Sequence, residues 1–201
     1  MSSSATTVKV LVGQVVDNKG SPVTLYKLWM DAGDLSLSFS SFTKVAEFDL
    51  SAESTAVSSM QFEVTNVIAA SKYRFVATAL NSIGESTGSA EARFAAASLP
   101  AKPGVILRGA GSTENQLQVE WNIEPDNEIL ISGYTLEVDL NQCGDFVEIW
   151  NGAGQPEVRT YSITTVTTGL YYSFRHKAMN YNGKSDDYSD VFITYACVMP
   201  A

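Results

Sequence analysis

Histidine, cysteine and long apolar runs are scarce in this 201-residue chain, and each shortage argues against a class of protein. A single histidine, His176, leaves no set of imidazoles for a hydrolytic triad or a histidine-based metal site. Two cysteines, Cys143 and Cys197, are too few for a disulfide-dense scaffold or for a zinc site of thiolates alone. No apolar run approaches the ~20 residues that span a bilayer, so we expect no membrane insertion.

Basic side chains are also few, with 13 Lys and Arg against 22 Asp and Glu and a net charge of −9. Nucleic acids and anionic lipids bind to clusters of basic side chains, which displace the counterions of these polyanions. Because such side chains are few here, we expect neither as a partner. The negative charge is uneven, at −2 for residues 1–100 and −7 for residues 101–201. We interpret the excess of acidic side chains as charge on a solvated surface. The alternative is a calcium-stiffened joint built from acidic loop residues, namely Asp126, Glu128, Asp186, Asp187 and Asp190.

The chain does contain an internal repeat. The segment 73–86 returns as 172–185, shifted by 99 residues, and both copies read Tyr-x-Phe-x-x-x-Ala-x-Asn-x-x-Gly-x-Ser. A period of this length is the size of one small β-sandwich, and alternation of apolar and polar residues up to a turn is typical of a half-buried strand. We therefore predict two tandem domains, residues 1–98 and residues 99–201, joined by the short proline-containing linker 99–103.

Short alternating runs, interrupted by Gly, Pro, Asn and Asp, predict an all-β chain. In the second domain the predicted strands are 105–107, 117–121, 133–138, 146–150, 161–163, 172–179 and 191–195. In the first domain they are 8–12, 24–30, 43–48, 61–64, 72–80 and 90–95, with a further strand-like stretch at 35–42. The first domain thus has no counterpart of the strand 105–107.

These patterns resemble the fibronectin type III family over nearly the whole chain. The resemblance rests on aromatic and aliphatic residues of the second, third and sixth strands, namely Trp121, Tyr134, Leu136, Tyr26, Leu28, Tyr73 and Tyr172. It implies two immunoglobulin-like β-sandwiches, in which Tyr73 and Tyr172 each make a corner hydrogen bond. It implies little about function, because such modules serve as adhesion units, spacers, receptor ectodomains and enzyme accessories.

The first domain departs from the family pattern in two ways. Val12 stands where the core tryptophan is expected, so Phe62 or Phe75 must fill that volume. Seven residues before the strand 8–12 are too few for a first strand and its connection, which leaves this sandwich without its own strand A and with an uncovered edge. We expect either that the natural protein is longer or that a neighbouring molecule supplies the missing edge strand.

Exposed aromatic side chains are the best indication of a functional surface. Tyr26 and Leu28 alternate with Trp29, so we expect Trp29 to point outward where the second domain has Glu137. Aromatic residues are enriched in protein interfaces, which predicts a docking face. The alternative is that neighbouring hairpin residues cover these rings. The residues of the predicted interaction surface are Trp29, Phe39, Phe42 and Trp150.

We interpret the remaining distinctive residues as structural. The predicted core includes Trp121, Tyr73, Tyr172 and His176. For His176 we expect a neutral ring hydrogen-bonded to backbone or to a hydroxyl, with a pH-sensitive core as the alternative. Cys143 follows the third strand and Cys197 follows the last, so they form either a disulfide or two unpaired thiols.

No phosphate-binding glycine loop, nucleophile elbow or catalytic carboxylate pair occurs, so we expect no catalysis, no cofactor and no bound metal. We interpret the chain as a structural or adhesive protein, at the cell surface or outside the cell, that binds proteins, including copies of itself, and assembles into an oligomer or filament. The alternative is a ligand- or glycan-recognition module of a larger surface receptor or carbohydrate-active enzyme. For the location, the alternative is the cytoskeleton or a cilium.

Overall fold

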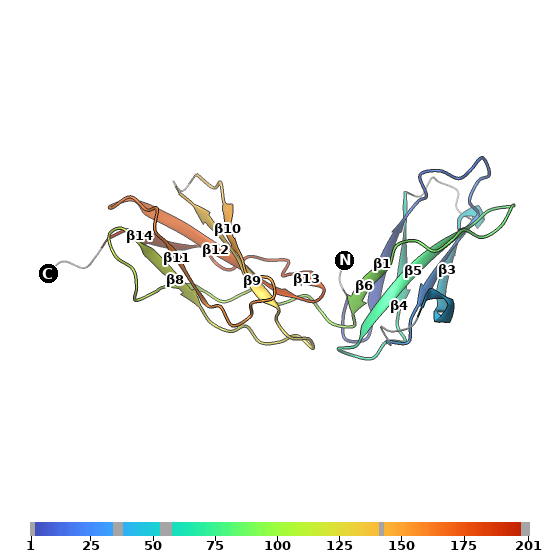
Figure 1. Cartoon of the computed structure of the whole chain (residues 1–201), viewed down its shortest axis with the longest axis horizontal. Helices are drawn as coiled ribbons and strands as arrows, with labels where there is room; N and C mark the ends of the chain where they lie inside the picture. Colours follow the sequence, from blue (N-terminus) through green and yellow to red (C-terminus); the bar gives the residue numbers. More distant parts are fainter. Residues whose placement is uncertain (1–2, 34–37, 53–57, 141–142, 198–201) are drawn as a thin grey trace. The chain divides into compact units, whose positions relative to one another are not determined.

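The computed structural model describes residues 3–33, 38–52, 58–140 and 143–197. The chain divides into two compact units, Met1–Ser98 and Leu99–Ala201. Within the described ranges, the regular structure consists of antiparallel strands and two single-turn 3₁₀ helices, η1 (Phe39–Ser41) and η2 (Leu50–Ala52) (Figure 1). The fold class is therefore the predicted one, all-β, with sandwiches of the immunoglobulin-like and fibronectin type III kind.

The first unit packs a two-stranded sheet against a four-stranded sheet. Its described strands are β1 (Val8–Gly13), β2 (Leu25–Met30), β3 (Thr43–Asp49), β4 (Ser59–Val64), β5 (Lys72–Leu80) and β6 (Ala92–Ala95). β1 pairs with β4, and the other sheet has the order β3-β2-β5-β6. Phe62 and Phe75 are both buried in the core between the two sheets, and Val12 packs against this core as a partly buried residue.

The second unit packs a three-stranded sheet against a five-stranded sheet. Its described strands are β7 (Ile106–Arg108), β8 (Leu117–Trp121), β9 (Gly133–Asp139), β10 (Val147–Asn151), β11 (Thr160–Ile163), β12 (Tyr171–Asn180), β13 (Gly183–Lys184) and β14 (Phe192–Tyr195). One sheet has the order β11-β8-β7, and the other the order β10-β9-β12, with β13 and β14 both paired to β12. Trp121 and Tyr134 are buried at the centre of this core.

Both units contain the tyrosine corner that the resemblance implies. The Tyr73 hydroxyl accepts a hydrogen bond from the Ile68 N–H at 2.8 Å, and the Tyr172 hydroxyl accepts one from the Thr167 N–H at 2.7 Å. Each bond spans five residues and joins the beginning of the long strand, β5 or β12, to the loop that precedes it. The corners therefore fix the chain where it crosses from one sheet to the other.

The strand-like pattern at residues 35–42 predicted the wrong local structure where it can be checked. Residues 34–37 lie outside the described residues, and Phe39–Ser41 form the 3₁₀ helix η1 instead of a strand. Its hydrogen bonds run from the Ser41 N–H to Ser38 and from the Phe42 N–H to Phe39. Because a 3₁₀ turn places residues i and i+3 on the same side, the Phe39 and Phe42 rings meet at 5.6 Å, edge to face.

Candidate functional site

The edge of β1 that faces away from β4 is unpaired among the described residues. The Gln14 N–H donates to the Ser58 carbonyl at 3.3 Å, one position beyond the Gly13–Ser59 pair. Hydrogen-bonded and non-bonded pairs alternate along an antiparallel ladder, so every second residue of β1 turns its backbone groups toward β4. The residues that turn their N–H and C=O groups to the open edge are Lys9, Leu11 and Gly13.

In the second unit, a strand occupies the position that corresponds to the open edge of β1. There β7 pairs antiparallel with β8, Leu107 lies opposite Glu120, and the side chain of Ile106 is only 1% exposed. In this part of the repeat the two units correspond at a shift of 109 residues, as the pairs Asp17-Asn18 and Asp126-Asn127 show. The same shift relates Leu11 to Glu120. The open edge of β1 is thus the place that a strand fills in the second unit, and Leu11 is 47% exposed beside it.

The predicted aromatic surface of the first unit is an ordered, largely covered cluster. Trp29 points away from the core, as predicted, but its Nε1 donates to the Thr78 hydroxyl at 2.9 Å, and the Phe39 ring lies 6.0 Å from it, edge to face. Phe42 is only 6% exposed, beneath the Arg74 guanidinium at 5.0 Å. Of these three rings, Phe39 is 37% exposed and Trp29 is partly buried, so these two, and not Phe42, offer surface to a partner.

Trp150 packs toward the core of the second unit and does not join an exposed aromatic face. β10 carries a register shift between Glu148 and Trp150. A bulge breaks the alternation of a strand, so Ile149 and Trp150 are both partly buried against the core. The Trp150 ring lies 5.5 Å from that of Trp121 and 6.2 Å from that of Tyr161.

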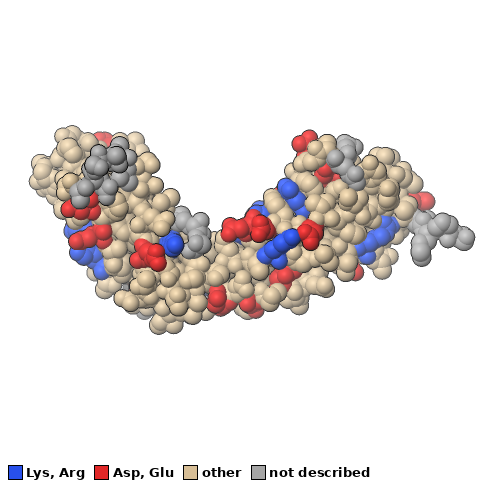
Figure 2. Space-filling model, turned by 180° about the vertical axis from the view of Figure 1, so that it is seen from behind, with Lys and Arg blue, Asp and Glu red and all other residues tan. Residues whose placement is uncertain are grey.

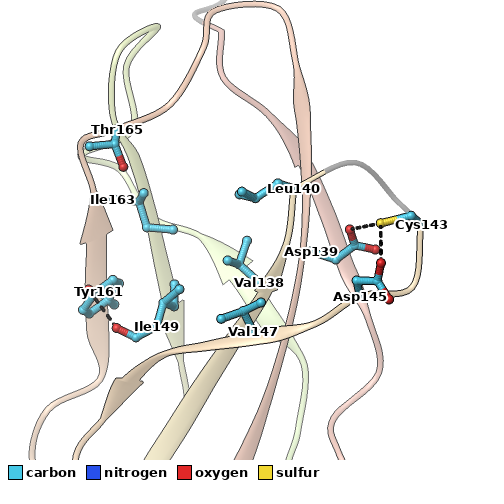
Figure 3. Close-up of a pocket in the computed structure, with 10 residues that line it drawn as sticks. All are labelled: Val138, Asp139, Leu140, Cys143, Asp145, Val147, Ile149, Tyr161, Ile163 and Thr165. Atoms are coloured by element: carbon cyan, nitrogen blue, oxygen red, sulfur yellow. Dashed lines mark hydrogen bonds between the residues drawn. The ribbon is translucent and has the colours of Figure 1, made fainter.

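Cys143 and Cys197 are both free cysteines, which corresponds to the alternative of two unpaired thiols. Cys143 lies in the turn from β9 to β10, whereas Cys197 follows β14, on the other side of β9 and β12 in the same sheet. The Cys143 Sγ lies 3.6 Å from a carboxylate oxygen of Asp139 and 3.5 Å from one of Asp145 (Figure 3). A backbone hydrogen bond from Asp145 lowers the pKa of this thiol, but desolvation and the two carboxylates outweigh it and raise the pKa overall.

Sequence reasoning missed a crevice of about 560 Å³ between the β9–β10 hairpin and β11. Figure 3 shows aliphatic side chains from both sides pointing into it, with the Asp139, Cys143 and Asp145 group at the hairpin end. The Tyr161 hydroxyl donates to the Ile149 carbonyl at 3.1 Å, which joins two of the residues that line the crevice. The apolar residues that line the crevice are Val138, Leu140, Val147, Ile149, Tyr161 and Ile163.

His176 is buried at 1% exposure, as expected for the core, but without the expected hydrogen bonds. Its ring lies 5.7 Å from that of Trp121 and 6.1 Å from that of Tyr134. Neither ring nitrogen has a hydrogen-bond partner among the described residues, and the same holds for Trp121 Nε1. Desolvation by burial lowers the pKa of His176 from 6.5 to about 4 and keeps the ring neutral at physiological pH.

The acidic loop residues make contacts within the second unit. Asp126 accepts from the Ile131 N–H at 2.8 Å, and Asp190 pairs with Lys102 at 2.6 Å. Among the described residues, no group of three or more His, Cys, Asp and Glu side chains is placed to hold a metal ion. The same residues include no helix with the length and hydropathy to cross a membrane. On the face seen in Figure 2, charged side chains of both signs are separated by wide areas without charge.

Comparisons with known proteins return solved structures of similar fold. No protein-family model matches the chain, and no curated protein matches it. A similar solved structure is that of the chicken CNTN1 FN1-FN3 domains, with 18% sequence identity and a TM-score of 0.44. The match covers 96% of this chain and 62% of that chain, so this chain spans less than two thirds of its length.

Proposed function

We propose that this chain is a non-catalytic protein-interaction module of tandem fibronectin type III-like sandwiches, and that it self-assembles by adding a strand at the open edge of β1. The single observation that supports this proposal is the contrast between the two units. β8 is paired on both sides, by β7 and β11, whereas β1 pairs only with β4 among the described residues. An unpaired edge exposes backbone donors and acceptors and is a template for a strand of another chain.

The partner strand in this proposal is β1 of a second copy. Antiparallel pairing about a two-fold axis at Leu11 places Leu11 opposite Leu11, and Lys9 opposite Gly13 of the other copy. No like charges then face each other, and the two exposed leucines meet as a cross-strand pair. The net charge of only −2 in residues 1–100 opposes this association less than the −7 of residues 101–201 would.

The test compares Leu11→Pro with Leu11→Thr in the full chain, by sedimentation velocity over a range of micromolar concentrations. Both variants remove the leucine side chain, but only proline removes the N–H that faces the open edge. Because that N–H makes no bond to β4, Leu11→Pro leaves the β1–β4 ladder intact. We expect the wild-type chain to associate, Leu11→Thr to associate more weakly, and Leu11→Pro to lose this contact. Equal association of the two variants, each with a native unfolding transition, contradicts the proposal.

The crevice of the second unit supports ligand recognition as a second candidate function. Its walls are mainly aliphatic and its volume suits a small apolar molecule better than a glycan, which needs more polar partners. The neutral dye Nile red is a suitable probe. Saturable binding that Ile163→Trp abolishes, by filling the crevice, supports this candidate, and binding unaffected by that substitution contradicts it.

A further inference from the structure

The outer face of β14 carries an unusual row of exposed apolar side chains in the second unit. Val191, which directly precedes β14, and Ile193 and Tyr195 within it lie at alternate positions and are 50%, 52% and 51% exposed. Tyr171 of β12 lies directly opposite Tyr195, is 39% exposed, and its ring meets that of Tyr195 at 5.3 Å. We call these four residues the β14 strip. None of them belongs to the buried core of the unit.

The first unit shows that the fold does not require apolar residues here. Tyr171 pairs with Tyr195 in the second unit, and Lys72 pairs with Ala95 in the first. In the same register, the first unit has Arg93 where the second has Ile193, and Glu91 where the second has Val191. The side chains of Arg93 and Glu91 form an ion pair at 3.2 Å. Charges on an edge strand prevent unwanted pairing, and the second unit lacks this protection on β14.

The backbone of β14 can also accept a second strand at Ile193. The Ala196 N–H donates to the Leu170 carbonyl, so the neighbouring Tyr171–Tyr195 pair is a non-hydrogen-bonded one. By alternation, Ile193 and Tyr195 turn their backbone groups away from β12. Arg108 caps the Tyr195 carbonyl. The Ile193 N–H and C=O are therefore the groups that face the edge without such a cap.

We propose that the β14 strip is a homotypic interface, at which β14 of one copy pairs antiparallel with β14 of a second copy. A two-fold axis at Ile193 sets Ile193 against Ile193, and Val191 against Tyr195 of the other copy, so every exposed residue meets an apolar one. The strip itself carries no charge, so no like charges meet within the pairing. Two units of net charge −7 repel each other elsewhere, and the apolar contact must exceed this repulsion.

This interface is distinct from the open edge of β1, because the two lie in different units. Each is isologous, so one alone yields a dimer. Two isologous interfaces on one chain link copies alternately through first units and through second units. Together they would produce an open chain of molecules, which gives the expected filament a specific connectivity.

The experiment measures the mass of the full chain in the Leu11→Pro background by sedimentation equilibrium. Ile193→Arg introduces the residue that the first unit has at this position, and Leu130→Arg is the matched control, since Leu130 is an exposed leucine of the same unit outside the strip. We expect a dimer in the Leu11→Pro background and with added Leu130→Arg, and a dissociation constant raised at least about tenfold with added Ile193→Arg. Tyr195→Ala, which copies the alanine that the first unit has at position 95, repeats the test if Ile193→Arg lowers the unfolding midpoint.

The outcomes separate the two proposals. A Leu11→Pro chain that is monomeric throughout, while the wild-type chain associates, overturns the β14 interface and supports the β1 edge. Association that Ile193→Arg alone abolishes supports the β14 interface and overturns the β1 edge. Equal effects of Ile193→Arg and Leu130→Arg overturn the β14 interface, and a monomeric wild-type chain overturns both.

Discussion

Mild acid is expected to destabilise the second unit through His176. Burial between Trp121 and Tyr134 holds its pKa at about 4 in the folded state, against 6.5 for an exposed ring. The unfolded chain therefore binds a proton that the folded chain excludes, and stability falls as the pH drops from about 6.5 toward about 4. One pKa unit corresponds to about 1.4 kcal/mol, so the full loss is about 3 kcal/mol, of which about 2 kcal/mol falls between about pH 7 and about pH 5.

The assay is urea unfolding followed by the fluorescence of Trp121 and Trp150, with Trp29 replaced by Phe so that only the second unit reports. His176→Phe keeps an aromatic ring in the core without a titratable group. The carboxylate of Glu148, whose pKa the Lys184 ammonium lowers, loses its stabilising effect only below its ordinary value of 4.5 and does not interfere. A wild-type stability that stays constant from about pH 7 to about pH 5, or a loss of the same size in His176→Phe, refutes the reasoning.

Two further predictions concern single side chains. Tyr172→Phe removes the corner bond to the Thr167 N–H and leaves that donor without its partner, so the second unit should lose about 1 to 2 kcal/mol in the urea assay, and an unchanged midpoint contradicts this. Asp145→Asn removes one of the carboxylates that raise the pKa of Cys143, so alkylation of that thiol near neutral pH should become faster in a mass-spectrometric time course; an unchanged rate argues against control by that carboxylate.

The strands were predictable from sequence because half-buried strands impose a simple alternation. The runs around Tyr26, Tyr134 and Tyr172 place an apolar residue in the core at alternate positions, and their strands form close to the predicted bounds. The unpaired edge of β1 among the described residues was also expected, because the first repeat shows no counterpart of the strand 105–107. These features depend on local pattern and on comparison of one repeat with the other.

Features that depend on contacts between distant strands could not be predicted. The alternation at residues 35–42 did not reveal that Phe39 closes a 3₁₀ turn and packs on Trp29. The register shift before Trp150 turns that ring inward, and a bulge has no distinct signal in this stretch of sequence. The absent hydrogen bonds of His176 and the crevice beside Ile163 arise from packing across the two sheets.

The account depends most on the open edge of β1, and amide hydrogen exchange across a dilution series tests it most directly. The N–H groups of Val10 and Val12 face β4 and serve as internal references, whereas those of Lys9, Leu11 and Gly13 face the edge. We predict fast exchange at the three edge positions in dilute solution and slow exchange once the protein is concentrated, with Val10 and Val12 slow throughout. Edge amides that stay fast at every concentration, or that are already slow in a dilute monomer, would contradict strand addition between copies.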